Sequence, residues 1–173
     1  MSTLGTVRHD RGAFDTLAEL MASDPDGFLE EIAVEHGVST LEVVKLLPER
    51  RRTIASGDHL QDVLNDITEW GDILFIVEAK DIISGMTAPL PKPFEADGYY
   101  HFFGTGFGGH LKQGACKHIA LVDRTFQKRR AVSVQFFNAD GEPIFKVFIS
   151  RDDEGDLRAD QLDRFDQLRA SLV

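Results

Sequence analysis

The sequence predicts a protein of the α+β class, in which a helical N-terminal segment precedes an antiparallel sheet and a C-terminal helix follows it. Apolar residues recur at helical spacing over residues 13–48, whereas β-branched and aromatic runs dominate residues 72–150. Strands and helices do not alternate through the β-rich part, so an antiparallel sheet is expected. The 173 residues are enough for one domain with a core of its own, and we expect residues 1–173 to form a single domain.

Three short helices are expected in the N-terminal segment. The apolar stripe of the first helix comprises Phe14, Leu17, Leu20 and Met21. Asp24 is a candidate N-cap for the second helix, and Gly37 follows the last periodic residue of that helix. Ser39 and Glu42 have capping-box spacing at the start of the third helix, which Pro48 ends. The segment is therefore predicted to be a helical packing unit.

The next residues link the helical segment to the β-rich part. The sequence Glu-Arg-Arg-Arg at residues 49–52 is expected to form an exposed connector, because all four side chains are charged. Asp58 is a candidate cap for a fourth helix that ends near Trp70 and Gly71.

Strand-like runs fill the β-rich part of the chain. They cover residues 73–77, 81–86, 98–103, 108–112, 118–122, 131–137 and 143–149. The turn signal at residues 138–141, Asn-Ala-Asp-Gly, predicts that the last two runs form a hairpin. Residues 157–172 are expected to form a C-terminal helix with Leu162, Phe165, Leu168 and Leu172 on one face.

Charge and composition exclude several classes of protein. The net charge of −10 disfavours non-specific binding to nucleic acid or to an anionic membrane. A single cysteine, Cys116, excludes an internal disulfide framework. No apolar run has the length of a membrane span, and the first residues lack the apolar stretch of a signal peptide. A cytoplasmic protein is therefore expected.

Residues 99–130 carry the residue types that chemistry would need. This stretch holds six basic residues against one acidic residue, Asp123, and it contains both tyrosines and three of the six histidines. Such a set suits a flat, apolar, dianionic ligand: aromatic side chains pack against its ring, basic side chains meet its carboxylates, and histidine or tyrosine reaches a metal. Haem is a ligand of this kind. The alternative is a β-meander with a solvated basic face.

Within this stretch, strand alternation predicts that Tyr99, His101 and Phe103 share one face. His110 follows two glycines, where a side chain can project into a cleft. A zinc site that combines His110 with Cys116 and His118 matches no known zinc spacing. The glycines of residues 104–109 lack the strand-to-helix context of a dinucleotide fingerprint, so phosphate binding is not expected.

A second pattern belongs to another class of protein. Residues 29–46 fit a helix-turn-helix pattern in which Gly37 makes the turn and Val38 is buried. The would-be recognition helix, residues 39–47, offers Lys45 as its one cation and lacks Arg, Asn and Gln to read base edges. A DNA-binding regulator therefore stays only as an alternative to a helical packing unit.

The chain resembles the intracellular haem-utilisation carriers of Gram-negative bacteria, the HutX/ChuX-like family. The resemblance is carried, in the order of the family, by Leu41–Pro48, Glu69–Gly71, Gly98–Tyr100, Gly109–Lys112, His118–Leu121, Phe136–Gly141 and Lys146–Asp153. It implies a large curled antiparallel sheet flanked by helices, and a homodimer whose paired sheets imitate the two halves of larger haem-handling relatives. It also implies a cytoplasmic carrier that binds haem and delivers it to a haem-degrading partner.

The resemblance also implies roles for particular residues. The iron ligands would be His110, from the Gly-His-Leu-Lys stretch, and Tyr99, from the Gly-Tyr-Tyr stretch. Some family members carry a further candidate histidine where this chain has Glu78. This difference favours Tyr99 and His110 as the iron ligands. Ferric protoporphyrin IX would be packed by Phe102 and Phe103, and its propionates would pair with Lys112 or, more remotely, with Lys117 or Arg124. An alternative activity is haem degradation, as in the larger relatives.

Overall fold

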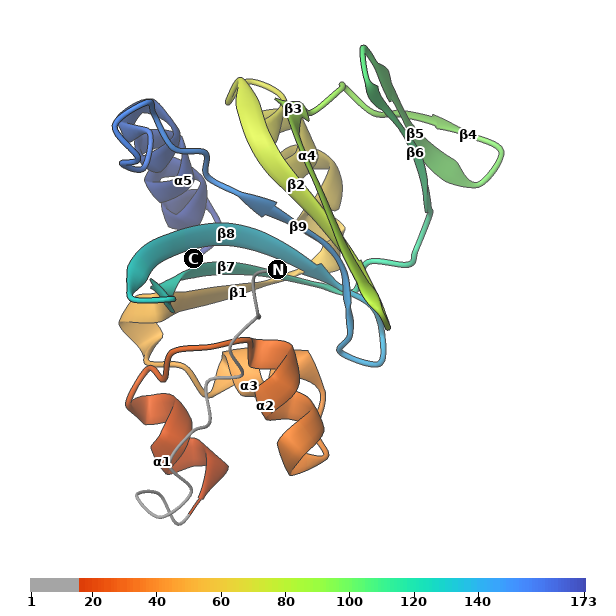
Figure 1. Ribbon diagram of the computed structural model, residues 1–173. Helices are drawn as coiled ribbons and strands as arrows, with labels where there is room; N and C mark the ends of the chain where they lie inside the picture. The colour runs from red at the N-terminus through yellow and green to blue at the C-terminus, as the bar shows by residue number, and fades with distance from the viewer. Residues whose placement is uncertain (1–15) are drawn as a thin grey trace.

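The computed structural model describes residues 16–173, and its largest element is a six-stranded antiparallel sheet with the strand order β1-β7-β8-β9-β2-β3. These strands are β1 (Arg52–Ser56), β7 (His118–Phe126), β8 (Arg129–Phe137), β9 (Pro143–Phe148), β2 (Asp72–Ala79) and β3 (Ile82–Pro89). Three further strands, β4 (Phe94–Ala96), β5 (Tyr99–Gly104) and β6 (Phe107–Lys112), form a separate antiparallel sheet. Figure 1 shows this small sheet projecting from one side of the body. The predicted α+β class with a large antiparallel sheet is confirmed.

Helices cover both faces of the six-stranded sheet (Figure 1). On one face, α1 (Leu17–Ala22), α2 (Leu29–His36) and α3 (Thr40–Lys45) form a core with Ala120, Val122 and Phe137. On the other face, α4 (Leu60–Ile67) and α5 (Ala159–Ser171) pack against Val134, Phe136 and Val147. Two 3₁₀ turns, η1 (Glu49–Arg51) and η2 (Gly57–His59), flank β1. Within the described residues, no helix is long and apolar enough to cross a membrane.

Several local signals read from the sequence are confirmed. Gly37 ends α2 in the left-handed conformation, with φ 66°. Ser39 and Glu42 form the capping box of α3, since the Ser39 hydroxyl accepts from the Glu42 amide and the Glu42 carboxylate accepts from the Ser39 amide. The β8–β9 hairpin turns at Asn138–Gly141 as predicted. Two observations explain why residue 141 is glycine: its φ is 77°, and a Cβ there would lie 2.5 Å from the Ser39 hydroxyl oxygen.

Other local predictions are wrong. Asp24 does not cap α2, which begins after Phe28; Asp24 has φ 52° and directs its carboxylate to Arg51 and Arg124. Asp58 lies inside η2, and His59 precedes α4. The stretch 49–52 is not a simple exposed connector, because it forms η1 and the first residue of an edge strand. Phe14, predicted for the first helical stripe, lies outside the described residues.

Candidate functional site

One face of the small sheet gathers aromatic and imidazole side chains. In the β5–β6 register, His101 lies opposite His110, Tyr99 opposite Lys112, and Phe103 opposite Gly108. Phe94 on β4 lies opposite His101. Since cross-strand partners project to the same side of a sheet, these residues share one surface. We call it the arm face, made of Phe94, Tyr99, His101, Phe103, His110 and Lys112.

The arm face is open to solvent although it is largely aromatic. Tyr99 is 41% exposed, Phe94 52% and Phe103 58%. The His101 ring stacks on Phe94 at a centroid distance of 5.1 Å and on Phe103 at 6.1 Å. The His110 ring stands edge-on to His101, at 4.8 Å, and to Tyr99, at 6.4 Å. Large exposed rings beside imidazoles are typical of a binding surface.

The opposite face of the small sheet attaches it to the body. Phe102, Phe107 and Leu111 are buried there, and the Phe107 ring meets Phe75 of β2 at 4.9 Å. Phe102 was predicted to pack a ring together with Phe103, but successive strand residues point to opposite sides. Phe102 therefore belongs to the core, and only Phe103 lies on the arm face.

The basic residues of the stretch 99–130 do not gather at one place. Lys112 alone among them lies on the arm face. Arg129 and Arg130 open β8, and Arg130 donates to both carboxylate oxygens of Asp123, at 2.9 and 2.7 Å. Arg124 is buried and donates to the carbonyls of Pro25 and Gly27. The structure thus separates Arg124 from the arm-face residues with which a propionate contact was expected.

Cys116 and His118 also lie away from the arm face. His118 is half-buried at the start of β7, and the Cys116 thiol donates to its carbonyl at 3.5 Å. Burial raises the pKa of the Cys116 thiol to about 11. No group of three or more metal-binding side chains is found among the described residues.

Cys116 is expected to be inert to thiol reagents in the folded protein. Because the thiolate is the reactive form, native protein at about pH 8 should react with a disulfide reagent at least about 100-fold more slowly than the unfolded chain. Following the absorbance of the released thiolate, with and without denaturant, measures both rates. Full reaction of the native protein within seconds would contradict the buried position.

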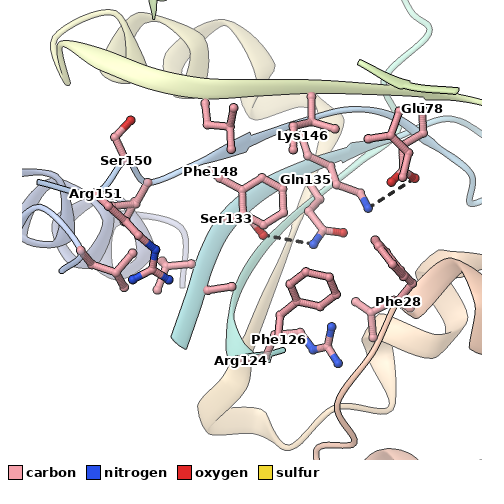
Figure 2. Close-up of a pocket in the computed structure, with 18 of the residues that line it drawn as sticks. Phe28, Glu78, Arg124, Phe126, Ser133, Gln135, Lys146, Phe148, Ser150 and Arg151 are labelled. Carbon is pink, nitrogen blue, oxygen red and sulfur yellow. Dashed lines mark hydrogen bonds and ion pairs between the residues drawn. The ribbon is translucent and has the colours of Figure 1, made fainter. Parts of the chain in front are cut away.

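A cavity of about 460 Å³ lies on the six-stranded sheet beside α2, apart from the arm face. Figure 2 shows Ser133 and Gln135 of β8 and Lys146 and Phe148 of β9 lining it, with Phe28 and Phe126 on the side of the helices. The rings of Phe28 and Phe126 meet edge to face at 4.9 Å. Among the residues that the structure describes, the lining contains no His, Tyr, Cys or Met. Histidine and tyrosine, two usual axial ligands of haem iron, lie instead on the arm face, as Tyr99, His101 and His110.

Three charged side chains of this cavity, Glu30, Glu78 and Lys146, are linked by ion pairs. Lys146 is 6% exposed and forms ion pairs with Glu30 of α2 and with Glu78 of β2, the latter at 3.7 Å (Figure 2). Burial, and to a lesser degree the nearby Glu30, raise the pKa of Glu78 above 4.5, although Lys146 opposes this shift. Glu78 thus lies beside Lys146 and Glu30 in the cavity wall, on a strand of the six-stranded sheet, whereas His101 and His110 belong to the small sheet.

The raised pKa of Glu78 predicts a pH-dependent stability. Between its ordinary value and the raised value the folded state binds more protons than the unfolded state, so the free energy of unfolding falls as pH rises through that window. We expect Glu78→Gln to raise the Tm by a few degrees at about pH 7 and to lose this advantage near pH 4. Thermal unfolding across pH checks it, and a lower Tm for the variant at neutral pH would show that attraction to Lys146 outweighs burial.

The helix-turn-helix pattern folds as helices but is used for packing. The would-be recognition helix α3 buries Thr40, Leu41, Val43 and Val44 in the core shared with the six-stranded sheet. The exposed residues of this helix are Glu42 and Lys45, which are not the side chains that usually read base edges. The packing of α3 therefore favours the interpretation of this segment as a structural unit.

Strand β4, which contributes to the arm face, was not predicted from the sequence. The β4–β5 turn is Asp97-Gly98, with φ 52° and 82°, which is the two-residue hairpin loop that such a dipeptide favours. It places Phe94 on the arm face. The Asp-Gly pair before the Tyr-Tyr run could have revealed both β4 and Phe94.

Fold and site together define a small antiparallel-sheet protein with an exposed face of aromatic, imidazole and phenol side chains. The chain belongs to the haem utilisation ChuX/HutX family, whose family model matches residues 53–168. A relative from Vibrio cholerae serotype O1, named intracellular heme transport protein HutX, is 33% identical over 151 residues, which are 86% of this chain and 78% of the relative. The solved structure of the heme binding protein ChuX is 36% identical, with a TM-score of 0.86, over 91% of this chain and 99% of that one.

The fold also matches part of a longer protein. The structure of the heme degrading enzyme ChuS of Escherichia coli O157:H7 is 16% identical, with a TM-score of 0.73. The match covers 98% of this chain but 49% of ChuS. At this identity the likeness concerns the fold alone, and it shows that one copy of this chain corresponds to about half of the longer protein.

Proposed function

We propose that this protein is a haem carrier that binds haem on the arm face. The observation that carries the proposal is the juxtaposition of Tyr99, His101 and His110 on one exposed surface, since tyrosine and histidine are known axial ligands of haem iron. The names of the HutX and ChuX relatives, a heme transport and a heme binding protein, support the same ligand.

The arm face offers a role for each kind of contact. His110 and Tyr99 are the candidate iron ligands, and both rise from the same side of one sheet. This side of the sheet would therefore supply one ligand to the iron, either His110 or Tyr99. Phe94 and Phe103 would contact the ring, and Lys112 would pair with a propionate as a charge-assisted contact. A single ligand on an open face suits a carrier, because release then requires one bond to the iron to break.

A titration of the purified protein with ferric protoporphyrin IX tests binding. We expect a saturable, shifted Soret band at one haem per chain, with charge-transfer bands that report imidazole or tyrosinate ligation. An unrelated acidic protein of similar size is the control. A spectrum no different from that control would overturn the proposal.

We further propose that the bound haem is handed intact to a haem-degrading protein. The family relationship to a transport protein supports a carrier, whereas the ChuS enzyme shares only the fold. Incubating the haem complex with ascorbate, with catalase present, separates the two functions. The Soret band of a carrier should persist and then move to apomyoglobin when that acceptor is added; its conversion to a bile-pigment spectrum would identify an enzyme.

We also propose a homodimer in the cytoplasm. The match of one chain to about half of ChuS supports pairing of two copies, and the HutX relative is named intracellular. Sedimentation should give a mass of about twice the 19.3 kDa of one chain, and cell fractionation should recover the protein with cytoplasmic markers. A mass of one chain at about 50 µM would contradict the dimer.

A further inference from the structure

Two hydrogen bonds of His101 indicate which ring nitrogens of His101 and His110 carry a proton. The Nε2 of His101 is 2.9 Å from the backbone carbonyl of Ala96, and its Nδ1 is 2.7 Å from the Nδ1 of His110. A carbonyl oxygen can only accept, so Nε2 of His101 must carry the proton and donate it to Ala96.

When both imidazoles are neutral, the second hydrogen bond has one direction. A neutral imidazole carries one ring proton, so the Nδ1 of His101 is an acceptor once its Nε2 is protonated. His110 must therefore donate from its own Nδ1. That leaves the Nε2 of His110 without a proton, with its lone pair free to bind a metal. In the neutral pair, the opposite tautomer of His110 would bring two bare Nδ1 atoms to 2.7 Å or cost His101 its bond to Ala96.

The surroundings of His101 hold this arrangement in place. Its ring packs against both Phe94 and Phe103, with interplanar angles of 22° and 17°, and these two rings also contact each other at a centroid distance of 6.1 Å. Ala96 belongs to β4, whose pairing with β5 fixes the carbonyl relative to His101. His101 is half-buried, whereas His110 is exposed, so the acceptor is the more firmly placed of the two rings.

We propose that His101 is a positioning residue: it locks His110 as the Nδ1–H tautomer and so presents the Nε2 of His110 to the iron of haem. This inference rests on the proposed haem-binding function and assigns the ligand atom within it. A metal-binding histidine usually donates its second ring nitrogen to an orienting group, and here a second histidine takes the place of the usual carboxylate or carbonyl.

The first test reads the tautomers in the haem-free protein and does not depend on haem binding. Long-range ¹H–¹⁵N spectra at about pH 8.5, where histidine is ordinarily neutral, should show His110 protonated at Nδ1 and His101 at Nε2. In His101→Phe, which keeps an aromatic ring in contact with Phe94 and Phe103, His110 should change to the Nε2–H form. An Nε2–H form of His110 in the unaltered protein would overturn the proposal.

The second test measures haem affinity. His101→Phe should weaken ferric-haem binding about 10- to 100-fold, the usual cost of losing an orienting group. His101→Gln, whose side chain offers one acceptor and one donor, should restore most of the affinity. His59→Phe, at an exposed histidine outside the arm face, is the matched control and should bind like the unaltered protein.

The outcomes separate this inference from the proposed function. Unchanged affinity in His101→Phe, in a protein that binds haem, would overturn the positioning role alone. If the unaltered protein does not bind haem, the proposed function fails, and the role of His101 toward iron fails with it, whatever tautomer the spectra show.

Discussion

Replacing His110 by alanine is expected to weaken ferric-haem binding about 100-fold or more and to remove the imidazole signature from the visible spectrum. The reason is the lone pair that the bond with His101 leaves on the Nε2 of His110. Tyr99→Phe keeps the aromatic surface and removes only the hydroxyl, so its affinity should fall less than about 10-fold. Absorption titrations of both variants, with electron paramagnetic resonance of the ferric complexes, provide the measurement.

The pair of variants also decides between the two candidate ligands. His59→Ala controls for the loss of a surface histidine. Affinity near that of the unaltered protein in His110→Ala, together with a large loss in Tyr99→Phe, would make tyrosinate the ligand and would contradict the assignment to His110.

Replacing Asp24 by asparagine is expected to lower the free energy of unfolding by about 3 kcal/mol, although the change is nearly isosteric. The Asp24 carboxylate lies 3.0 Å from Nε of Arg51 and 4.0 Å from Nε of Arg124, and both Asp24 and Arg124 have side chains less than a tenth exposed. Burial lowers the pKa of Arg124, and Asp24 is the charge that most opposes this. Without Asp24, the buried guanidinium loses its main counter-charge.

For a chain of this size, that loss corresponds to a fall in Tm of about 6–12 °C. Thermal and denaturant unfolding of Asp24→Asn measure the effect. Asp163→Asn, on the exposed side of α5, is the control and should change the Tm by less than about 2 °C. Equal melting of the two variants would show that the cluster around Asp24 is solvated and contributes little.

The fold was predictable where local signals and tertiary structure agree. Three examples are the capping box at Ser39, the glycine at residue 37 and the turn at Asn138–Gly141. Each depends on interactions within a few residues, so the local sequence was enough to predict it. Asp24 could not be predicted in the same way. Its carboxylate serves Arg51 and Arg124, which are distant in the sequence, and this competes with the capping role that its local context suggests.

The candidate site was predictable in part for the same reason. Strand alternation placed Tyr99, His101 and Phe103 on one face, and the register now adds His110 and Lys112 to that face. The separation of Phe102 follows from the same alternation. The bond between His101 and His110 depends on cross-strand register, which residue spacing alone leaves open. The concentration of basic residues did not predict a basic site, because Arg124 and Arg130 serve structural carboxylates and carbonyls.

The most direct test of the account is to map where haem lies by its paramagnetic effect on backbone amide signals. Ferric haem should broaden the amides of Tyr99, His101 and His110 on the arm face beyond detection. The amides of Ser133 and Gln135, in the cavity of the six-stranded sheet, should keep their intensity. Broadening confined to Ser133, Gln135 and their neighbours, with the arm-face signals intact, would contradict the account and place haem in the cavity.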